Sequence, residues 1–196
     1  MSNNALRSVR NTEPDPRIAR TTHALGRALI ELIQERDYDE ITVQQILDRA
    51  GVGRATFYAH YRNKDDALHA QYEQLFGWLE SLLDRRQNGR WRLFPVAEFV
   101  EHLEDARSLA LALHRADRLE DAFEQFAGHA ASVIDQRLGD WSSLRTTVPR
   151  PLVARMLAGA LTEMLRWWWE DATRATAVEM DAAFHELARG VLRRDR

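Results

Sequence analysis

The sequence contains no cysteine. This absence excludes a disulfide framework, a thiolate nucleophile and a cysteine-ligated zinc ion. Charged residues also interrupt the chain before about 18 apolar residues can follow one another, and the first 20 residues lack the apolar stretch of a signal peptide. We therefore expect a soluble, cytoplasmic protein that makes no membrane contact.

Lysine is nearly absent, because Lys64 is the one lysine among 27 basic residues. The formal net charge of −3 is unevenly distributed. Residues 1–64 hold ten basic and eight acidic residues (net +2), and the remainder holds 17 and 22 (net −5). Such asymmetry is compatible with an N-terminal part that faces nucleic acid, although solvated faces also carry blocks of charge.

Motifs of catalysis are missing as well. The chain has no H-E-x-x-H pair, no G-x-S-x-G elbow and no glycine-rich phosphate loop. His102 and His114 stand in charged segments that are typical of solvated helix faces. We expect neither an enzyme nor a metal site, and no cofactor.

Apolar residues recur three and four positions apart, and the alternation of a β-strand never persists. This pattern predicts an all-α fold of about nine helices. The first helix should end near residues 36–39, and its apolar face comprises Ile18, Thr22, Leu25, Leu29, Leu32 and Ile33.

The segment from residue 42 to 61 predicts two short helices joined by a tight turn. Thr42 and Gln45 have the spacing of a capping box, which starts a helix whose apolar residues are Val43, Ile46, Leu47 and Ala50. Gly51 can then adopt a positive φ and end this helix, and Val52 fills the angle between the two helices. Two helices joined by a glycine turn form a helix-turn-helix, which places its second helix in the major groove of DNA.

The second of these helices, Arg54 to Tyr61, divides into two faces. Phe57 and Tyr61 are four residues apart and should be buried together. The outward residues combine hydrogen-bond donors, a flat ring and small side chains, as a groove-facing helix requires; they are Arg54, Ala55, Thr56, Tyr58 and His60. The alternative is that these are ordinary exposed residues of a helical bundle.

Further helices follow the fourth one, which Asn63 should cap and whose apolar stripe comprises Leu68, Tyr72, Leu75, Leu79 and Leu82. They are expected at 95–106, 107–116 and 118–138. After a loop through Trp141, Pro151 should occupy the first position of the next helix, and Thr176 with Glu179 should form a capping box for the last one.

The stretch ITVQQILDRAGVGRATFYAHYRNKDDAL, residues 41–68, closely resembles the DNA-binding segment of the TetR family of transcriptional regulators. The resemblance covers roughly residues 17–70 and includes the start at Thr42, the turn at Gly51 and the Thr56-Phe57-Tyr58 core. It implies a homodimer in which each subunit has a three-helix head that binds DNA and a helical body that binds a small molecule.

The resemblance also implies roles for single residues. Thr42 and Lys64 would contact phosphates, whereas Arg54 and Ala55 would face base edges. Contacts with the DNA backbone or groove are expected from Thr56, Tyr58 and His60, and Tyr61 is included in the same DNA-binding set. Two positions depart from the family pattern: Gly53 replaces a capping serine or threonine, and Asp37 stands where glycine often ends the first helix, in a left-handed conformation that aspartate also tolerates.

The body contains the most apolar helix of the chain, and its heptad-like seam predicts a dimer contact. The expected interface residues are Val153, Leu157, Ala160, Leu161, Met164, Trp168, Phe184, Leu187 and Val191. Of the three successive tryptophans, Trp168 falls on this seam. One of Trp167 and Trp169 should join the dimer contact and the other should face a pocket or a neighbouring helix, unless all three are simply core or rim residues.

A pocket for an effector is expected among the middle helices, with walls formed by Trp78, Phe99, Phe123, Phe126 and Trp167. The chemical class of the effector stays open, and core packing is the alternative interpretation of these aromatic residues.

We therefore predict a flexible N-terminal arm (1–16), a helix-turn-helix DNA-binding domain (17–63) and an effector-binding and dimerisation domain (64–196) connected through a helix at 64–87. The function expected from this organisation is that of a dimeric regulator, most simply a repressor that a small molecule releases from a palindromic operator on double-stranded DNA. The alternatives are a protein-interaction module that never touches DNA, and a regulator controlled by a protein partner.

Overall fold

The computed structural model describes residues 16–84, 92–140, 148–170 and 175–192. Within these ranges it contains nine α-helices, one short 3-10 helix and no strand, which confirms the predicted all-α fold. The expected N-terminal arm, the loop at Trp141 and residues 85–87 of the connecting helix lie outside the described residues.

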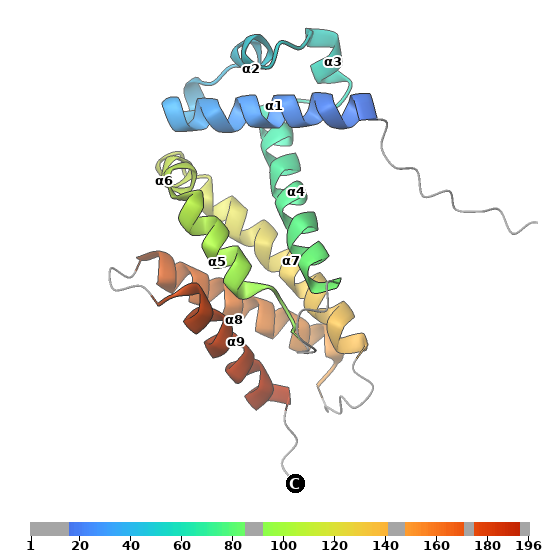
Figure 1. The fold of residues 1–196 in the computed structure, drawn as a ribbon, viewed down its shortest axis with the longest axis vertical. Helices are drawn as coiled ribbons and strands as arrows, with labels where there is room; N and C mark the ends of the chain where they lie inside the picture. The colour runs from blue at the N-terminus through green and yellow to red at the C-terminus, as the bar shows by residue number, and fades with distance from the viewer. Residues whose placement is uncertain (1–15, 85–91, 141–147, 171–174, 193–196) are drawn as a thin grey trace, which may run out of the picture.

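Three helices form the N-terminal end of the molecule (Figure 1). Helix α1 (Pro16–Glu35) crosses this end, and α2 (Val43–Ala50) and α3 (Arg54–Tyr58) cover its outer side. The predicted inner face of α1 is buried from Leu25 onward, whereas Ile18, in the first turn of the helix, is exposed. A short 3-10 helix, η1 (Tyr38–Glu40), joins α1 to α2.

The ends of α2 are as the sequence predicts. The Thr42 hydroxyl accepts a hydrogen bond from the Gln45 amide, and the Thr42 amide donates to the Gln45 side chain, which completes the capping box. Gly51 has a φ of 65° and ends the helix in the left-handed region. The prediction for Asp37 is wrong, since its φ of −63° and ψ of 135° are those of extended backbone.

Helix α3 is shorter than predicted and ends at Tyr58. Gly53 is its N-cap and provides no side-chain hydrogen bond. Phe57 is fully buried, and its ring contacts that of Tyr61 edge-on at a centroid distance of 5.6 Å. These two aromatic side chains anchor a helix too short to be stable alone.

Helix α4 (Lys64–Asp84) runs from the N-terminal helices into the rest of the molecule (Figure 1). Asn63 caps its start by accepting a hydrogen bond from the Asp66 amide at 2.8 Å. Its buried stripe includes Leu68, Tyr72 and Leu79 as predicted, together with Phe76 and Leu83.

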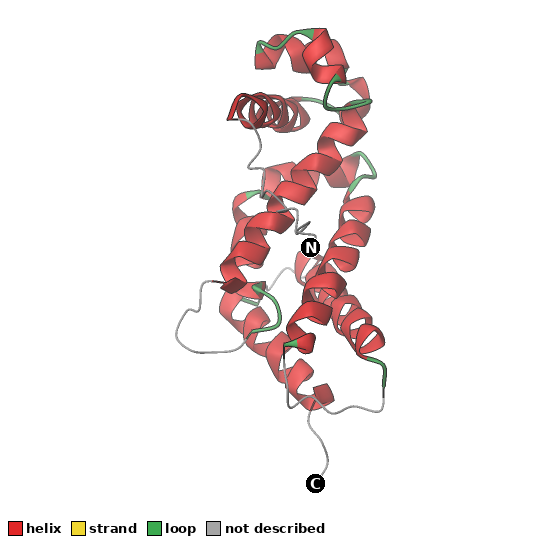
Figure 2. Cartoon of the chain, turned by 90° about the vertical axis from the view of Figure 1, so that its right-hand side faces the viewer, coloured by secondary structure: helices red, strands yellow, loops and turns green. Residues whose placement is uncertain are grey.

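Five further helices form the body: α5 (Val96–Asp105), α6 (Arg107–Arg115), α7 (Leu119–Gly139), α8 (Arg150–Glu170) and α9 (Ala177–Leu192). Helix α7 packs mainly against α8, and α5 packs mainly against α9. Helix α6 contacts α1, so the body supports the N-terminal helices both there and at α4. Figure 2 shows that the described residues form helices joined by loops. Pro151 is the second residue of α8 and not the first, and the Thr176–Glu179 capping box of α9 is present.

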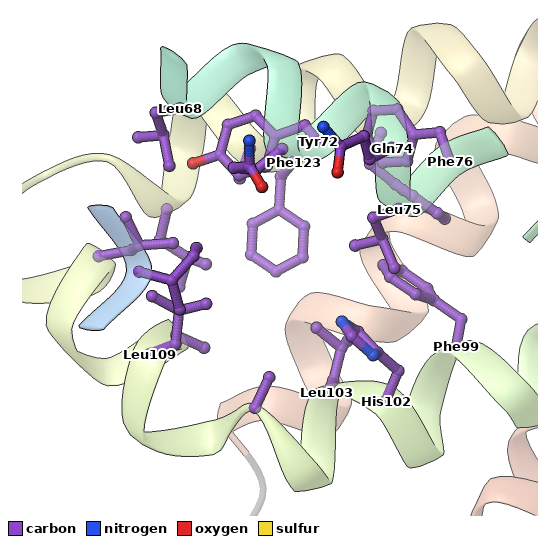
Figure 3. A pocket seen from close by; sticks show the side chains of 18 of the residues that line it. Leu68, Tyr72, Gln74, Leu75, Phe76, Phe99, His102, Leu103, Leu109 and Phe123 are labelled. Carbon is purple, nitrogen blue, oxygen red and sulfur yellow. The ribbon is translucent and has the colours of Figure 1, made fainter. Parts of the chain in front are cut away.

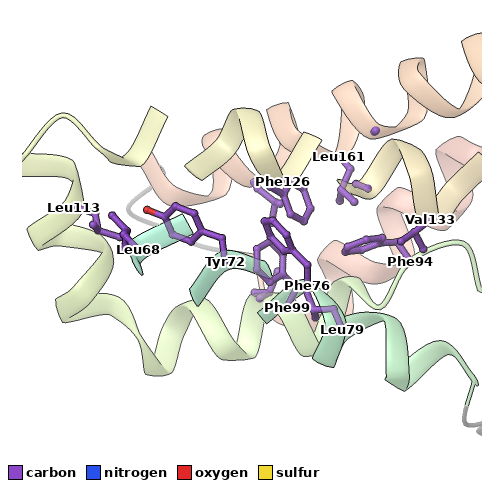
Figure 4. Close-up of a cluster of buried hydrophobic side chains, with 14 of the residues drawn as sticks. Leu68, Tyr72, Phe76, Leu79, Phe94, Phe99, Leu113, Phe126, Val133 and Leu161 are labelled. Carbon is purple, nitrogen blue, oxygen red and sulfur yellow. The ribbon is translucent and has the colours of Figure 1, made fainter. Parts of the chain in front are cut away.

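Stacked aromatic rings occupy the centre of the body (Figure 4). The rings of Phe99 and Phe126 are parallel within 13° at a centroid distance of 4.6 Å. Phe94 meets Phe126 edge-on at 5.4 Å, and Phe76 lies 6.3 Å from it. Side chains from α4, α5 and α7 therefore share one aromatic core.

Candidate functional sites

The outer surface of α3 carries the side chains that the sequence assigned to DNA contact. Arg54, Ala55, Thr56 and Tyr58 are exposed, and 51% of the surface of Tyr58 is accessible. The Tyr58 ring packs edge-on against Phe57 at 5.4 Å, so the buried neighbour orients the exposed ring. Donors, a ring and a small side chain are thus exposed on α3, and α3 lies at the opposite end of the molecule from α8 and α9 (Figure 1).

Arg54 lies against the exposed side of α2. Its Nη2 donates to the Gln44 Oε1 at 3.3 Å, and Gln44 in turn donates to Asp48 at 2.8 Å. A guanidinium carries five N–H donors, so this bond orients Arg54 and leaves most of its donors for another partner.

The remaining members of the predicted DNA-binding set differ in accessibility. Thr42 is exposed and His60 is half-buried. Tyr61 is buried beneath Phe57, so its assignment to the outer surface is wrong. Its spacing from Phe57 had already indicated an inward direction.

The ammonium group of Lys64 is hydrogen-bonded within the protein. Its Nζ donates to the carbonyl oxygens of Tyr38 at 2.6 Å and Asp39 at 3.3 Å, and it lies 4.4 Å from the centroid of the Tyr38 ring. The ammonium group therefore joins the start of α4 to the connection between α1 and α2. An ammonium has three hydrogens, so one donor is left for a phosphate.

A polar junction around Tyr38 joins the N-terminal helices to the body, and sequence reasoning missed it. The buried Tyr38 hydroxyl donates to Asp65 Oδ1 at 2.7 Å. Arg118, at the start of α7, lies 5.3 Å from the centroid of the same ring, and its guanidinium is within 4 Å of both Asp39 and Asp65. These residues are far apart in sequence, so no local pattern could have indicated the junction.

A cavity of about 590 Å³ opens between α1, α4, α5, α6, α7 and α8 (Figure 3). Of the predicted pocket residues, Trp78, Phe99, Phe123 and Phe126 line it. Trp167 does not, and the prediction is wrong for this residue because its side chain points away from the body.

The three successive tryptophans face three different environments. Trp168 is fully buried, and its Nε1 donates to the Ala175 carbonyl at 2.8 Å. Trp169 lines the cavity, and Trp167 is 53% exposed. The 100° step between helical residues produces this division.

The predicted dimer seam is wrong for its most apolar members. These side chains are buried within the chain itself; they are Val153, Leu157, Leu161 and Trp168 of α8, which packs against α7, and Phe184 of α9, which packs against α5. Ala160 and Met164 are half-buried, and Leu187 and Val191 are exposed. A second apolar stripe of α8 is the exposed one, and it comprises Leu152, Met156 and Trp167.

The described residues contain no group of three or more metal-ligating side chains, and no helix among them has the length and apolar character of a membrane-spanning segment.

Comparison with known proteins finds a family model and several proteins that are similar to this chain. The model of the bacterial regulatory proteins of the tetR family matches residues 27–70. An uncharacterized HTH-type transcriptional regulator of Bacillus subtilis (strain 168), YxbF, is 38% identical over 61 residues, which are 31% of this chain and 16% of that protein. A TetR transcriptional regulator from Streptococcus agalactiae 2603V is 25% identical and superposes with a TM-score of 0.59 over 88% of this chain and 95% of that one. Residues 27–70 thus match the TetR family, and the fold of the described residues is similar to that of a solved TetR regulator.

A second solved TetR-family structure extends the likeness through the body. Thermus thermophilus FadR, a repressor solved in complex with lauroyl-CoA, is 25% identical with a TM-score of 0.52, over 89% of this chain and 97% of that one. The family consists of transcriptional regulators, which agrees with the prediction that this chain is not an enzyme. The match to YxbF spans only about a sixth of that protein, so it bears on the N-terminal helices alone.

Proposed function

We propose that this TetR-like chain is a homodimeric, sequence-specific DNA-binding repressor that acts in the cytoplasm and leaves its palindromic operator when a small molecule binds the body. Residues 17–63 would form the DNA-binding domain, and residues 64–196 the domain for dimerisation and effector binding. The observation that carries the proposal is the outward face of α3, which presents Arg54, Ala55, Thr56 and Tyr58 together on an exposed helix beside α2.

Base recognition is assigned to Arg54 and Ala55. Arginine pairs with guanine through two hydrogen bonds, worth about 1–3 kcal/mol of discrimination, and the small side chain of Ala55 permits close approach. Thr42, Thr56, Tyr58 and His60 are assigned to the sugar-phosphate backbone and groove. Lys64 is assigned to a phosphate through the donor that Tyr38 and Asp39 leave unused.

Dimerisation is assigned to the exposed apolar side chains of α8 and α9. Leu152, Met156 and Trp167 form the contribution of α8, and Leu187 and Val191 that of α9. Clusters of exposed apolar side chains on neighbouring helices are typical of association surfaces. A two-fold axis at this surface would present two copies of α3 to successive major grooves, about 34 Å apart.

Effector control is assigned to the cavity, because two of its walls also belong to the polar junction. Leu68 and Tyr72 line both the cavity and a smaller hollow of about 30 Å³, which Asp65 and Arg118 also line. A ligand that displaces α4 at Tyr72 would move the start of the same helix, and with it Lys64 and the DNA-binding helices. The effector shifts the equilibrium only as far as it binds the two arrangements differently.

The test is fluorescence anisotropy with duplexes selected from a random-sequence pool, against scrambled duplexes, at two salt concentrations. We expect selective binding that weakens steeply with salt, because phosphate contacts dominate the affinity. Arg54→Ala should lower affinity for the selected duplex much more than for the scrambled one, whereas Lys64→Ala should lower both and flatten the salt dependence.

Gln136→Ala, at an exposed position of α7 outside the cavity, is the matched control and should change neither. A folded dimer that selects no sequence from the pool would refute the proposal and favour a protein-interaction module.

A further inference from the structure

The cavity is lined without ionisable acids or strong bases. Of its 22 described lining residues, none is Asp, Glu, Lys or Arg. The polar ones are three glutamines, Tyr72 and His102, and the rest are aliphatic or aromatic (Figure 3). This lining has a direct consequence for the ligand, because an ion moved from water into such a site loses its hydration and gains no counter-ion, which costs several kcal/mol.

An anion would also find no strong donor inside. His102 carries an imidazole beside Trp78, at a centroid distance of 5.6 Å, at the cavity wall. Burial lowers the pKa of His102, and the nearby Asp105 opposes this only in part, so the imidazole is neutral at pH 7. It supplies one neutral donor or acceptor, as do the amides of Gln71 and Gln74.

A ligand cation would lie near positively charged arginine side chains of the protein itself. The Arg166 guanidinium lies 4.6 Å from the centroid of the Phe123 ring, and that of Arg107 lies 5.2 Å from the Trp169 ring. Phe123 and Trp169 are both cavity walls, so two of the aromatic faces that could attract a ligand cation are already engaged. Arg166 is paired with Glu120, and neither Arg166 nor Arg107 is among the residues that line the cavity, so both guanidinium groups lie behind the rings and not at the cavity surface.

The remaining walls of the cavity suit a ligand with flat aromatic rings. Seven lining residues are Phe, Tyr or Trp, and the stacked pair of Phe99 and Phe126 continues the aromatic core to the cavity surface. Aromatic pairs prefer offset-stacked or edge-on contact, which adds to the stabilisation from the area that they bury.

We propose that the effector of this protein is an uncharged, largely aromatic molecule, and that the cavity discriminates against both carboxylates and ammonium compounds of the same shape. This inference rests on the proposed function and specifies the ligand class of the same site.

The experiment is isothermal titration calorimetry of the full chain with three probes on one ring system: 2-acetylnaphthalene (neutral), 2-naphthoate (anion) and trimethyl(2-naphthylmethyl)ammonium (cation). We expect the neutral probe to bind at least about tenfold more tightly than either ion. Ala106→Phe, which places a ring in the cavity, should abolish its binding while thermal unfolding shows an intact fold.

A second variant tests the electrostatic cause without disturbing the core. Gln74 is an exposed residue at the cavity wall, so Gln74→Lys should fold normally and bring one cation to the site. Gln74→Met, of similar shape but uncharged, removes the same amide and is the reference for this comparison. Relative to Gln74→Met, Gln74→Lys should bind 2-naphthoate more tightly and the quaternary ammonium probe more weakly, and it should change the affinity for 2-acetylnaphthalene least.

Tightest binding by either ion, or no binding of the neutral probe, would overturn the inference. Anisotropy with the selected DNA duplex, measured on the same preparations, reports the proposed function separately. A chain that binds the neutral probe but no DNA refutes the regulator and leaves the ligand class standing, and a chain that binds DNA but prefers an ion does the reverse.

Discussion

Two neighbouring tryptophans should respond to truncation in opposite ways. Trp168 is completely buried and Trp167 is 53% exposed on the surface assigned to the dimer. Trp168→Ala should therefore destabilise the subunit, whereas Trp167→Ala should weaken the dimer and leave the subunit folded.

The magnitudes follow from these positions. Truncating a buried tryptophan to alanine costs about 3–5 kcal/mol, and the Ala175 carbonyl also loses its 2.8 Å hydrogen bond, worth about 1 kcal/mol. A chain of this size loses roughly 2–4 °C in melting temperature per kcal/mol, so we expect a decrease of roughly 10 °C or more. Trp167→Ala should change subunit stability by about 0.5 kcal/mol or less. If Trp167 is a central interface residue, the dimer dissociation constant should rise by about 30-fold, which corresponds to about 2 kcal/mol.

Sedimentation velocity over a range of protein concentrations measures the dissociation constant, and urea unfolding at one fixed concentration measures stability. Dimer dissociation itself lowers apparent stability, so the concentration must match between variants. An unchanged dissociation constant in Trp167→Ala would refute the assignment of the surface. If Trp168→Ala left the subunit stable and weakened the dimer, this result would support the dimer contact at Trp168 that the sequence predicted.

Four other predictions concern the fold. Gly53→Ser should raise stability by a few tenths of a kcal/mol in thermal unfolding, because serine caps α3 and the space around Gly53 is open, whereas Gly51→Ala should lower it by about 1 kcal/mol because φ is positive there. Tyr38→Phe should cost about 1–2 kcal/mol in urea unfolding, since the Asp65 carboxylate loses a buried donor, and an unchanged midpoint would contradict this. Burial opposes ionisation of Asp181, yet hydrogen bonds from His185 and Arg92 hold its pKa at about 2, below the ordinary 3.8. Its stabilisation is therefore complete above pH 4 and is lost as the pH falls towards 2. The stability difference between parent and Asp181→Asn should shrink by about 2 kcal/mol over that range, and a constant difference would show that Asp181 is not responsible.

The sequence alone determined the local features of the N-terminal helices. A capping box needs only two side chains three residues apart, and the left-handed turn at Gly51 needs only a missing Cβ, so both were predictable at Thr42 and Gly51. The burial of Phe57 followed from its spacing to Tyr61. These signals act within one or two helical turns, and the family resemblance rests on the same residues.

Only the tertiary structure decided which apolar stripe of α8 is covered. Periodicity identified Leu157 and Trp168 as a seam but could not distinguish contact with α7 from contact with a second subunit, since both bury apolar area. The same limit applies to the three successive tryptophans. Steps of 100° make their side chains point in three directions, but the sequence does not tell which direction leads to the core, to the cavity or to solvent. The junction of Tyr38 with Arg118 depends on chain segments 80 positions apart, which only the packing of α7 beside α4 brings together.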